Sequence, residues 1–147
     1  MSVTFKSLVI FRVHSLVCAL DCLEVQEIIK ESKGLTSVKR TNHYIDGVIN
    51  LRGEIVSVLN LMSFFDMVYE RNPDESIIVV KDSGECIGLK VSSVIDVIEI
   101  AKNKIESSPA VPKGLKSQYL KGVFELDGEL ISLLSVAGLS EMEEKVS

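Results

Sequence analysis

The chain contains one segment twice. Residues 45–61 read IDGVINLRGEIVSVLNL and residues 120–136 read LKGVFELDGELISLLSV, an offset of 75. Both glycines recur at the same places, and most other paired positions are apolar in both copies. The main exception is Arg52, which stands where the second copy has Asp127. A duplicated scaffold with one charge changed in one copy predicts a binding protein with one specialised face.

The repeat extends beyond this segment. Residues 25–29 align with residues 94–98 at an offset of 69, so each half is expected to run strand, short turn or helix, strand and Gly-bounded hairpin. A brief helix is expected over 21–29, with Asp21 and Glu24 forming a capping box at its start, and a matching stretch is expected in the second half. Strands are expected at residues 8–13, 16–20, 48–51, 55–61, 77–80, 86–91, 123–126 and 130–134.

Each copy of the hairpin has a glycine at its turn. Arg52-Gly53 separates two apolar strands in the first copy, and Asp127-Gly128 does so in the second. Asp-Gly is typical of a two-residue turn, because glycine adopts positive φ without Cβ strain. We therefore interpret Gly53, Asp127 and Gly128 as structural turn residues. Arg52 leaves two interpretations open: a solvated turn residue, or a positive anchor for a partner, since its guanidinium offers a planar fork of donors.

The composition favours an all-β fold. The chain has 147 residues, 46% of them apolar and none of them Trp, so Val, Ile and Leu must form most of the core, and these residues favour strands. Two halves of about 70 residues would make small barrels or sandwiches that are marginal alone. They are expected to pack together as subdomains over about 12–72 and 73–140, with the N-terminal strand able to cross over and 141–147 as a polar tail. The groove between them is the expected place for a partner.

The sequence does not point to catalysis, a cofactor or a metal. His14 and His43 are not spaced with cysteines as zinc ligands are, and Cys18 and Cys22 fit small buried side chains better. The sequence has no nucleophile motif and no phosphate-binding glycine-rich loop. We therefore expect no enzymatic activity, no cofactor and no metal site.

Charge and hydropathy limit the partners and the location. A net charge of −5 argues against nucleic acid, because phosphate binding needs clustered Lys and Arg. Apolar runs are too short to cross a bilayer, and Lys6 and Arg12 interrupt any signal-peptide segment. Three cysteines, an odd count, fit reduced thiols. The expectation is a cytoplasmic protein without direct membrane insertion.

Residues 44–61 resemble the signature of the CheW family, whose core is Gly-Val-x-Asn-Leu-Arg-Gly. The resemblance extends over nearly the whole chain. It implies one domain over 1–147, built from two small five-stranded SH3-like β-barrel subdomains with short helices. It also implies a non-catalytic chemotaxis adaptor that couples chemoreceptors, the methyl-accepting chemotaxis proteins, to the histidine kinase CheA in signalling arrays.

The resemblance further implies partners and site residues. The partners are the regulatory domain of a CheA-type kinase, the cytoplasmic tip of a chemoreceptor and other CheW-like domains in rings, which places the protein at membrane-associated receptor arrays. By motif position, Arg52 corresponds to the family's receptor-coupling arginine. Val25 and Gly47 correspond to positions near the partner surfaces, and Glu27, on the same predicted helix as Val25, shares that surface.

Five positions depart from the family's pattern. The family often has Pro where this chain has Asn42 and Ser57, and Asp where it has Asn60, Ser92 and Ser135. The fold is expected to survive, with helix caps or surface charges lost and partner choice altered. A second hypothesis is therefore a divergent scaffold or inhibitor that binds the kinase regulatory domain without receptor coupling. A third is a small barrel that binds a peptide or RNA, although the negative charge and few aromatic residues weigh against RNA.

Overall fold

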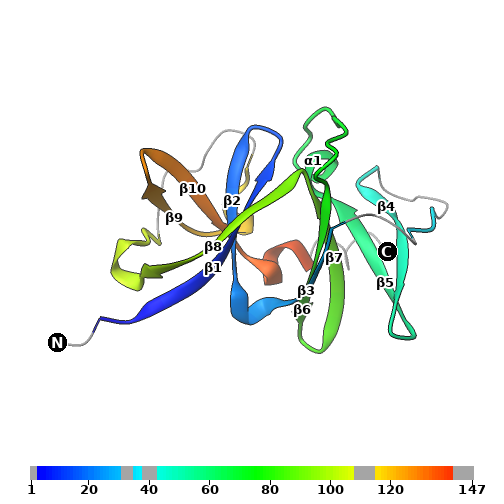
Figure 1. Ribbon diagram of the computed structural model, residues 1–147, viewed down its shortest axis with the longest axis horizontal. Helices are drawn as coiled ribbons and strands as arrows, with labels where there is room; N and C mark the ends of the chain where they lie inside the picture. The colour runs from blue at the N-terminus through cyan, green and yellow to red at the C-terminus, as the bar shows by residue number, and fades with distance from the viewer. Residues whose placement is uncertain (1–2, 31–34, 38–42, 108–114, 141–147) are drawn as a thin grey trace.

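The strands form two five-stranded sheets, which lie side by side in Figure 1. The computed structural model describes residues 3–30, 35–37, 43–107 and 115–140. We name the sheets the β1 barrel, with strand order β8-β1-β2-β10-β9, and the β5 barrel, with order β3-β6-β7-β5-β4. The predicted all-β class with two small five-stranded subdomains is confirmed.

The β1 barrel contains β1 (Phe5–Val13), β2 (Leu16–Asp21), β8 (Ser93–Ala101), β9 (Leu120–Leu126) and β10 (Glu129–Leu134). The β5 barrel contains β3 (Val25–Ile29), β4 (Ile45–Leu51), β5 (Glu54–Asn60), β6 (Ser76–Asp82) and β7 (Glu85–Val91). The helices are α1 (Leu61–Phe64) and three 3-10 turns, η1 (Cys22–Glu24), η2 (Lys102–Lys104) and η3 (Ser117–Tyr119). All eight strands expected from the sequence are present with ends within three residues, and β1, β4 and β9 each begin three residues earlier than expected.

A short backbone bridge closes each barrel. In the β5 barrel, Thr36 and Val48 exchange two hydrogen bonds of 2.8 Å, which joins the segment after β3 to β4. A Cβ on Gly47 would lie 2.2 Å from the Thr36 carbonyl oxygen, so only glycine lets the two backbones approach this closely. In the β1 barrel, a Cβ on Gly122 would lie 2.7 Å from the carbonyl oxygen of Glu106, which bridges to β9. The repeated glycine therefore serves barrel closure.

The barrels do not coincide with the sequence halves. The expected subdomains over 12–72 and 73–140 are wrong, because β6 and β7 lie in the sheet of β3, β4 and β5, whereas β1 and β2 lie with β8, β9 and β10. Four of the eight strand pairings join the first half to the second: β1–β8, β2–β10, β3–β6 and β5–β7. The chain crosses between barrels after β2 and again after β7. A repeat in the sequence does not show whether the strands of one half pair with each other or with strands of the other half.

The predicted helix over 21–29 is wrong, and so is its match at 94–98. Only η1 is helical in the first stretch, and β3 follows it, while the second stretch lies within β8. The Asp21 carboxylate does accept a hydrogen bond from the Leu23 amide at 3.0 Å, but Glu24 pairs with Lys121 at 3.1 Å instead of completing a capping box. β-Branched Val and Ile dominate both stretches, and such side chains pack well on a pleated surface.

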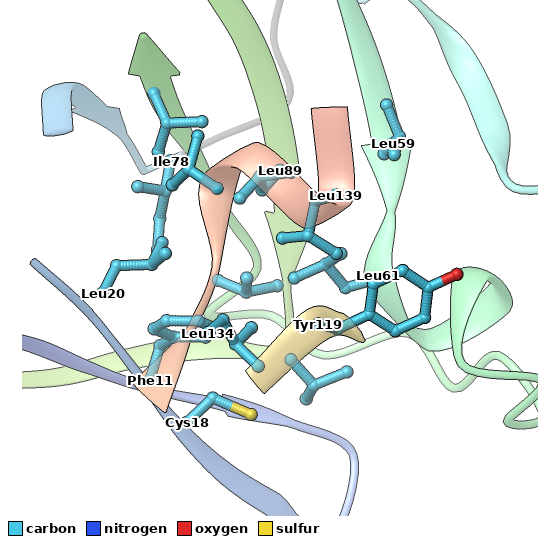
Figure 2. Close-up of a cluster of buried hydrophobic side chains, with 14 of the residues drawn as sticks. Phe11, Cys18, Leu20, Leu59, Leu61, Ile78, Leu89, Tyr119, Leu134 and Leu139 are labelled. Atoms are coloured by element: carbon cyan, nitrogen blue, oxygen red, sulfur yellow. The ribbon is translucent and has the colours of Figure 1, made fainter. Parts of the chain in front are cut away.

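The core has three parts, one inside each barrel and a larger one between them. Along β1, Leu8 and Ile10 point into the β1 barrel, whereas Val9, Phe11 and Val13 contribute to the cluster between barrels. Strands buried on both faces explain the continuous apolar runs in the sequence. Figure 2 shows part of the central cluster, which includes Leu20 and Leu59 from the first half and Leu89 and Leu134 from the second.

Candidate functional site

Arg52 occupies a backbone position that does not suit it. Arg52 and Gly53 have φ values of 53° and 85° at the β4–β5 turn, and Asp127 and Gly128 have 52° and 79° at the β9–β10 turn. Positive φ at both central residues defines a type I′ turn, which Asn and Asp tolerate better than Arg. The Arg52 side chain is 83% exposed. Because backbone preference does not explain this arginine, its side chain is the candidate for function.

Glu27 lies beside Arg52, although 25 residues separate them in the sequence. Arg52 Nη2 donates to Glu27 Oε1 at 3.2 Å, and the Glu27 side chain is 31% exposed. The second carboxylate oxygen, Oε2, is shielded from solvent and has no hydrogen-bond partner among the described residues. The pair thus leaves the guanidinium exposed at the surface, whereas this carboxylate oxygen is covered.

Val25 and Gly47 play different parts in the structure. Val25 begins β3, pairs with Val80 and packs half-buried against the cluster between the barrels. Gly47 is buried on β4, where it closes the β5 barrel on Thr36. The structure therefore brings Arg52 and Glu27 into contact, whereas Val25 serves packing between the barrels and Gly47 serves backbone closure.

A groove runs between the outer strands of the two barrels. Its volume is about 430 Å³, and it is lined by Ile28, Lys30, Asp74, Ser76, Ser93 and Val94. Ile28 directly follows Glu27 on β3 and is 39% exposed, while Ile95 and Val97 on β8 are 48% and 57% exposed. Sequence reasoning missed these apolar surface residues, because it assigned both stretches to helices. Their β-branched runs were the signal for strands.

The three residues that stand where the family often has Asp each accept hydrogen bonds from backbone amides. The Asn60 side chain caps α1 by accepting from the amides of Met62 and Ser63. Ser135 Oγ accepts from the Gly138 amide at 3.1 Å, and Ser92 Oγ accepts from the His14 amide at 2.9 Å. The expectation that caps are lost is therefore wrong. Ser57 lies half-buried on β5, and Asn42 falls outside the described residues.

Neither the cysteines nor the acidic residues form a reactive cluster in the described part of the chain. Cys18, Cys22 and Cys86 are free thiols, and burial raises the pKa of Cys18 to about 12. The described residues contain no group of three or more His, Cys, Asp or Glu that could hold a metal ion. No helix among them is long and apolar enough to span a membrane.

Comparison with known proteins identifies the family. The CheW-like domain profile matches residues 7–144. The chain belongs to the CheW family. It is 31% identical over 132 residues to "Chemotaxis protein CheW" of Thermotoga maritima, covering 89% of this chain and 85% of that protein. The corresponding protein of Klebsiella aerogenes is 29% identical over 126 residues, 85% of this chain and 75% of the relative.

A solved structure supports the same assignment. The crystal structure of the scaffolding protein TtCheW from Thermoanaerobacter tengcongensis matches with a TM-score of 0.83 and 30% sequence identity, over 90% of each chain. The family resemblance of residues 44–61 is therefore confirmed, and the two-barrel arrangement is that of a CheW protein.

The unfavourable turn conformation of Arg52 leads to a prediction. Replacing Arg52 by Asn should raise the free energy of unfolding by up to about 1 kcal/mol, because Asn-Gly is a preferred type I′ sequence and the exposed ion pair with Glu27 contributes little. Urea unfolding monitored by circular dichroism measures the change. A loss of more than about 1 kcal/mol would mean that the Arg52–Glu27 contact stabilises the fold.

Proposed function

We propose that this protein is a chemotaxis scaffold that couples chemoreceptors to a CheA-type histidine kinase and has no catalytic activity of its own. The observation that carries the proposal is the CheW-like match over residues 7–144, nearly the full described chain. The similar solved protein is named a scaffolding protein, and the relatives are named chemotaxis proteins. The partners of this chain are then a kinase regulatory domain, a receptor tip and other CheW-like domains, in the cytoplasm at membrane-associated arrays.

The surface around Arg52 suits a helical partner. The exposed guanidinium offers donors, and Ile28, the residue after Glu27 on β3, lines the groove. A receptor tip is a helical hairpin, and an amphipathic helix binds a groove through apolar contacts with polar contacts at the rim. Arg52 and Glu27 are therefore proposed as the polar rim. Ile28, Val94 and Ile95 are proposed as apolar contacts.

The test is calorimetric titration with two separate partners, the regulatory domain of each CheA from the same genome and the cytoplasmic tip of a chemoreceptor. We expect Arg52→Ala to weaken receptor binding about 10-fold or more, since a central arginine commonly contributes over 1.4 kcal/mol. Kinase binding should change less than about 2-fold. Arg12→Ala is the matched control, because that arginine is 45% exposed on the other barrel.

Three outcomes separate the hypotheses. Unchanged binding of both partners after Arg52→Ala would remove Arg52 from the proposed site. Kinase binding by the wild type without receptor recruitment would favour the divergent scaffold or inhibitor. Binding of neither partner by protein that circular dichroism shows to be folded would mean that the scaffold has lost both contacts, and the proposed function would fail.

A further inference from the structure

The two sequence repeats interlock. The first repeat spans residues 5–64 and contains β1 to β5 and α1, while the second spans residues 76–140 and contains β6 to β10. Each repeat gives two strands to one barrel and three to the other, so both barrels are mixed. Four of the eight strand pairings cross between the repeats. A single repeat would leave backbone N–H and C=O groups unpaired at the edges of its strands, and such edges readily pair with another strand.

The central core is also shared. Figure 2 labels five side chains from each repeat, all of them in one cluster. Leu20 and Leu89 occupy matching positions at the offset of 69, and both are fully buried. Lys90 of the second repeat pairs with Asp46 of the first at 3.0 Å. Half of the strand pairings and the central core therefore link one repeat to the other, and the identity of the chain that supplies each repeat does not alter these contacts.

The segment over residues 66–75 is the direct covalent link between the repeats. Most of its residues are exposed. Its contacts divide between the two sides: Glu70 lies 3.6 Å from His14 in the first repeat, and Glu75 lies 3.4 Å from Lys90 in the second. This segment can therefore change its path without breaking a strand pairing of either barrel.

We infer that the two repeats can be supplied by different copies of this chain, so that the protein forms a strand-exchanged dimer with a second copy of itself. The first repeat of one copy pairs with the second repeat of the other, and every strand pairing is retained. At micromolar concentration the monomer dominates, because a short linker gives an effective concentration of about millimolar. Since Glu27 and Arg52 both belong to the first repeat, each half of the dimer carries the complete pair. The inference does not depend on the proposed function.

Complementation between two full-length variants tests the exchange. Leu20→Asp places a charge in the buried core contributed by the first repeat, and Leu89→Asp does the same in the second. Each variant alone is expected to lose its sheet signal in far-ultraviolet circular dichroism. An equimolar mixture, refolded together, should recover about half of the wild-type signal per chain and elute as a dimer, because one intact copy of each repeat is present per two chains.

The control mixes Leu20→Asp with Leu8→Asp, both of which damage the first repeat. That mixture should not recover. Recovery in the control, or a complementing mixture whose spectrum equals the sum of its two unfolded components, would overturn the inference.

A second measurement covers the case in which a single variant stays folded. Deleting residues 68–71 removes up to about 14 Å of reach from the connection, so the deletion variant should be a dimer by light scattering with a wild-type spectrum. Inserting eight Gly and Ser residues after Arg71 should leave a monomer. A deletion variant that folds as a monomer would overturn the inference, and if it does not fold, the complementation result decides.

Discussion

Replacing Lys90 by Met is expected to lower the free energy of unfolding by about 3–5 kcal/mol. Lys90 Nζ lies 3.0 Å from Asp46 Oδ2 and 3.4 Å from Glu75 Oε1, and its side chain is only 10% exposed. Burial alone would lower the pKa of Lys90, but the hydrogen bond to Asp46 and the charges of both carboxylates outweigh burial and raise it. Met is similar in size but leaves the two carboxylates without this cation. Urea unfolding followed by circular dichroism measures the loss.

The pH dependence of stability tests whether the ion pairs of Lys90 with Asp46 and Glu75 cause this loss. Because the pKa of Lys90 is raised above its unfolded value of 10.5, the stabilisation is fully present below pH 10.5 and is lost as pH rises through the folded pKa. The wild type should therefore lose stability in this alkaline range, and Lys90→Met should not show that loss. Lys81→Met, on the exposed face of β6, is the matched control and should change stability by less than about 0.5 kcal/mol. Equal losses in the two variants would contradict the assignment.

The hairpins are the part of the fold that local sequence determines. The Asp127-Gly128 turn and its counterpart at Arg52-Gly53 both have the positive φ values that the sequence predicts. The stretches at 25–29 and 94–98 were harder, because apolar residues there fit a short helix face as well as a strand. Each of these strands pairs along one edge with a strand from the other half, so its conformation depends on tertiary contacts.

The pairing of the halves is the largest gap between sequence and structure. The repeat defines two equivalent sets of strands. Their similarity does not show whether the strands of one set pair with one another or with strands of the other set. Here β5 pairs with β7 and β10 pairs with β2, in parallel, so each barrel needs both halves. A boundary drawn near residue 72 follows the repeat correctly and still divides the β5 barrel. Only the pairing pattern in three dimensions resolves it.

The sequence proposes residues for the candidate site but does not show their geometry. Arg52 stood out because it breaks the repeat, and the family resemblance added Glu27, Val25 and Gly47. The 3.2 Å contact between Arg52 and Glu27 depends on the closure of the β5 barrel, which the sequence does not reveal. The groove was expected between the subdomains. Its lining residues could not be foreseen, because they depend on the strand pairing within the chain that places β3 near β8.

Replacing Gly47 by Ala should lower the free energy of unfolding by about 3 kcal/mol, because a Cβ would lie 2.2 Å from the Thr36 carbonyl oxygen and the barrel could not close without backbone movement. Gly84→Ala is the matched control. Gly84 has a φ of 86° with no atom within 4 Å of a Cβ, so its substitution should cost only the left-handed backbone term of about 1–2 kcal/mol. Thermal and urea unfolding of the two variants measure the difference.

Measuring how the folded Gly47→Ala variant binds the kinase separates two roles for Gly47: closure of the β5 barrel and direct contact with a partner. Gly47 is buried and has no side chain at the surface, so its influence on partners is expected to act through closure of the β5 barrel. At a temperature where Gly47→Ala is folded, calorimetry should give a kinase affinity within about 2-fold of the wild type. A loss of about 10-fold or more in fully folded protein would instead place a partner directly against the Gly47 backbone, and β4 would then belong to the interface.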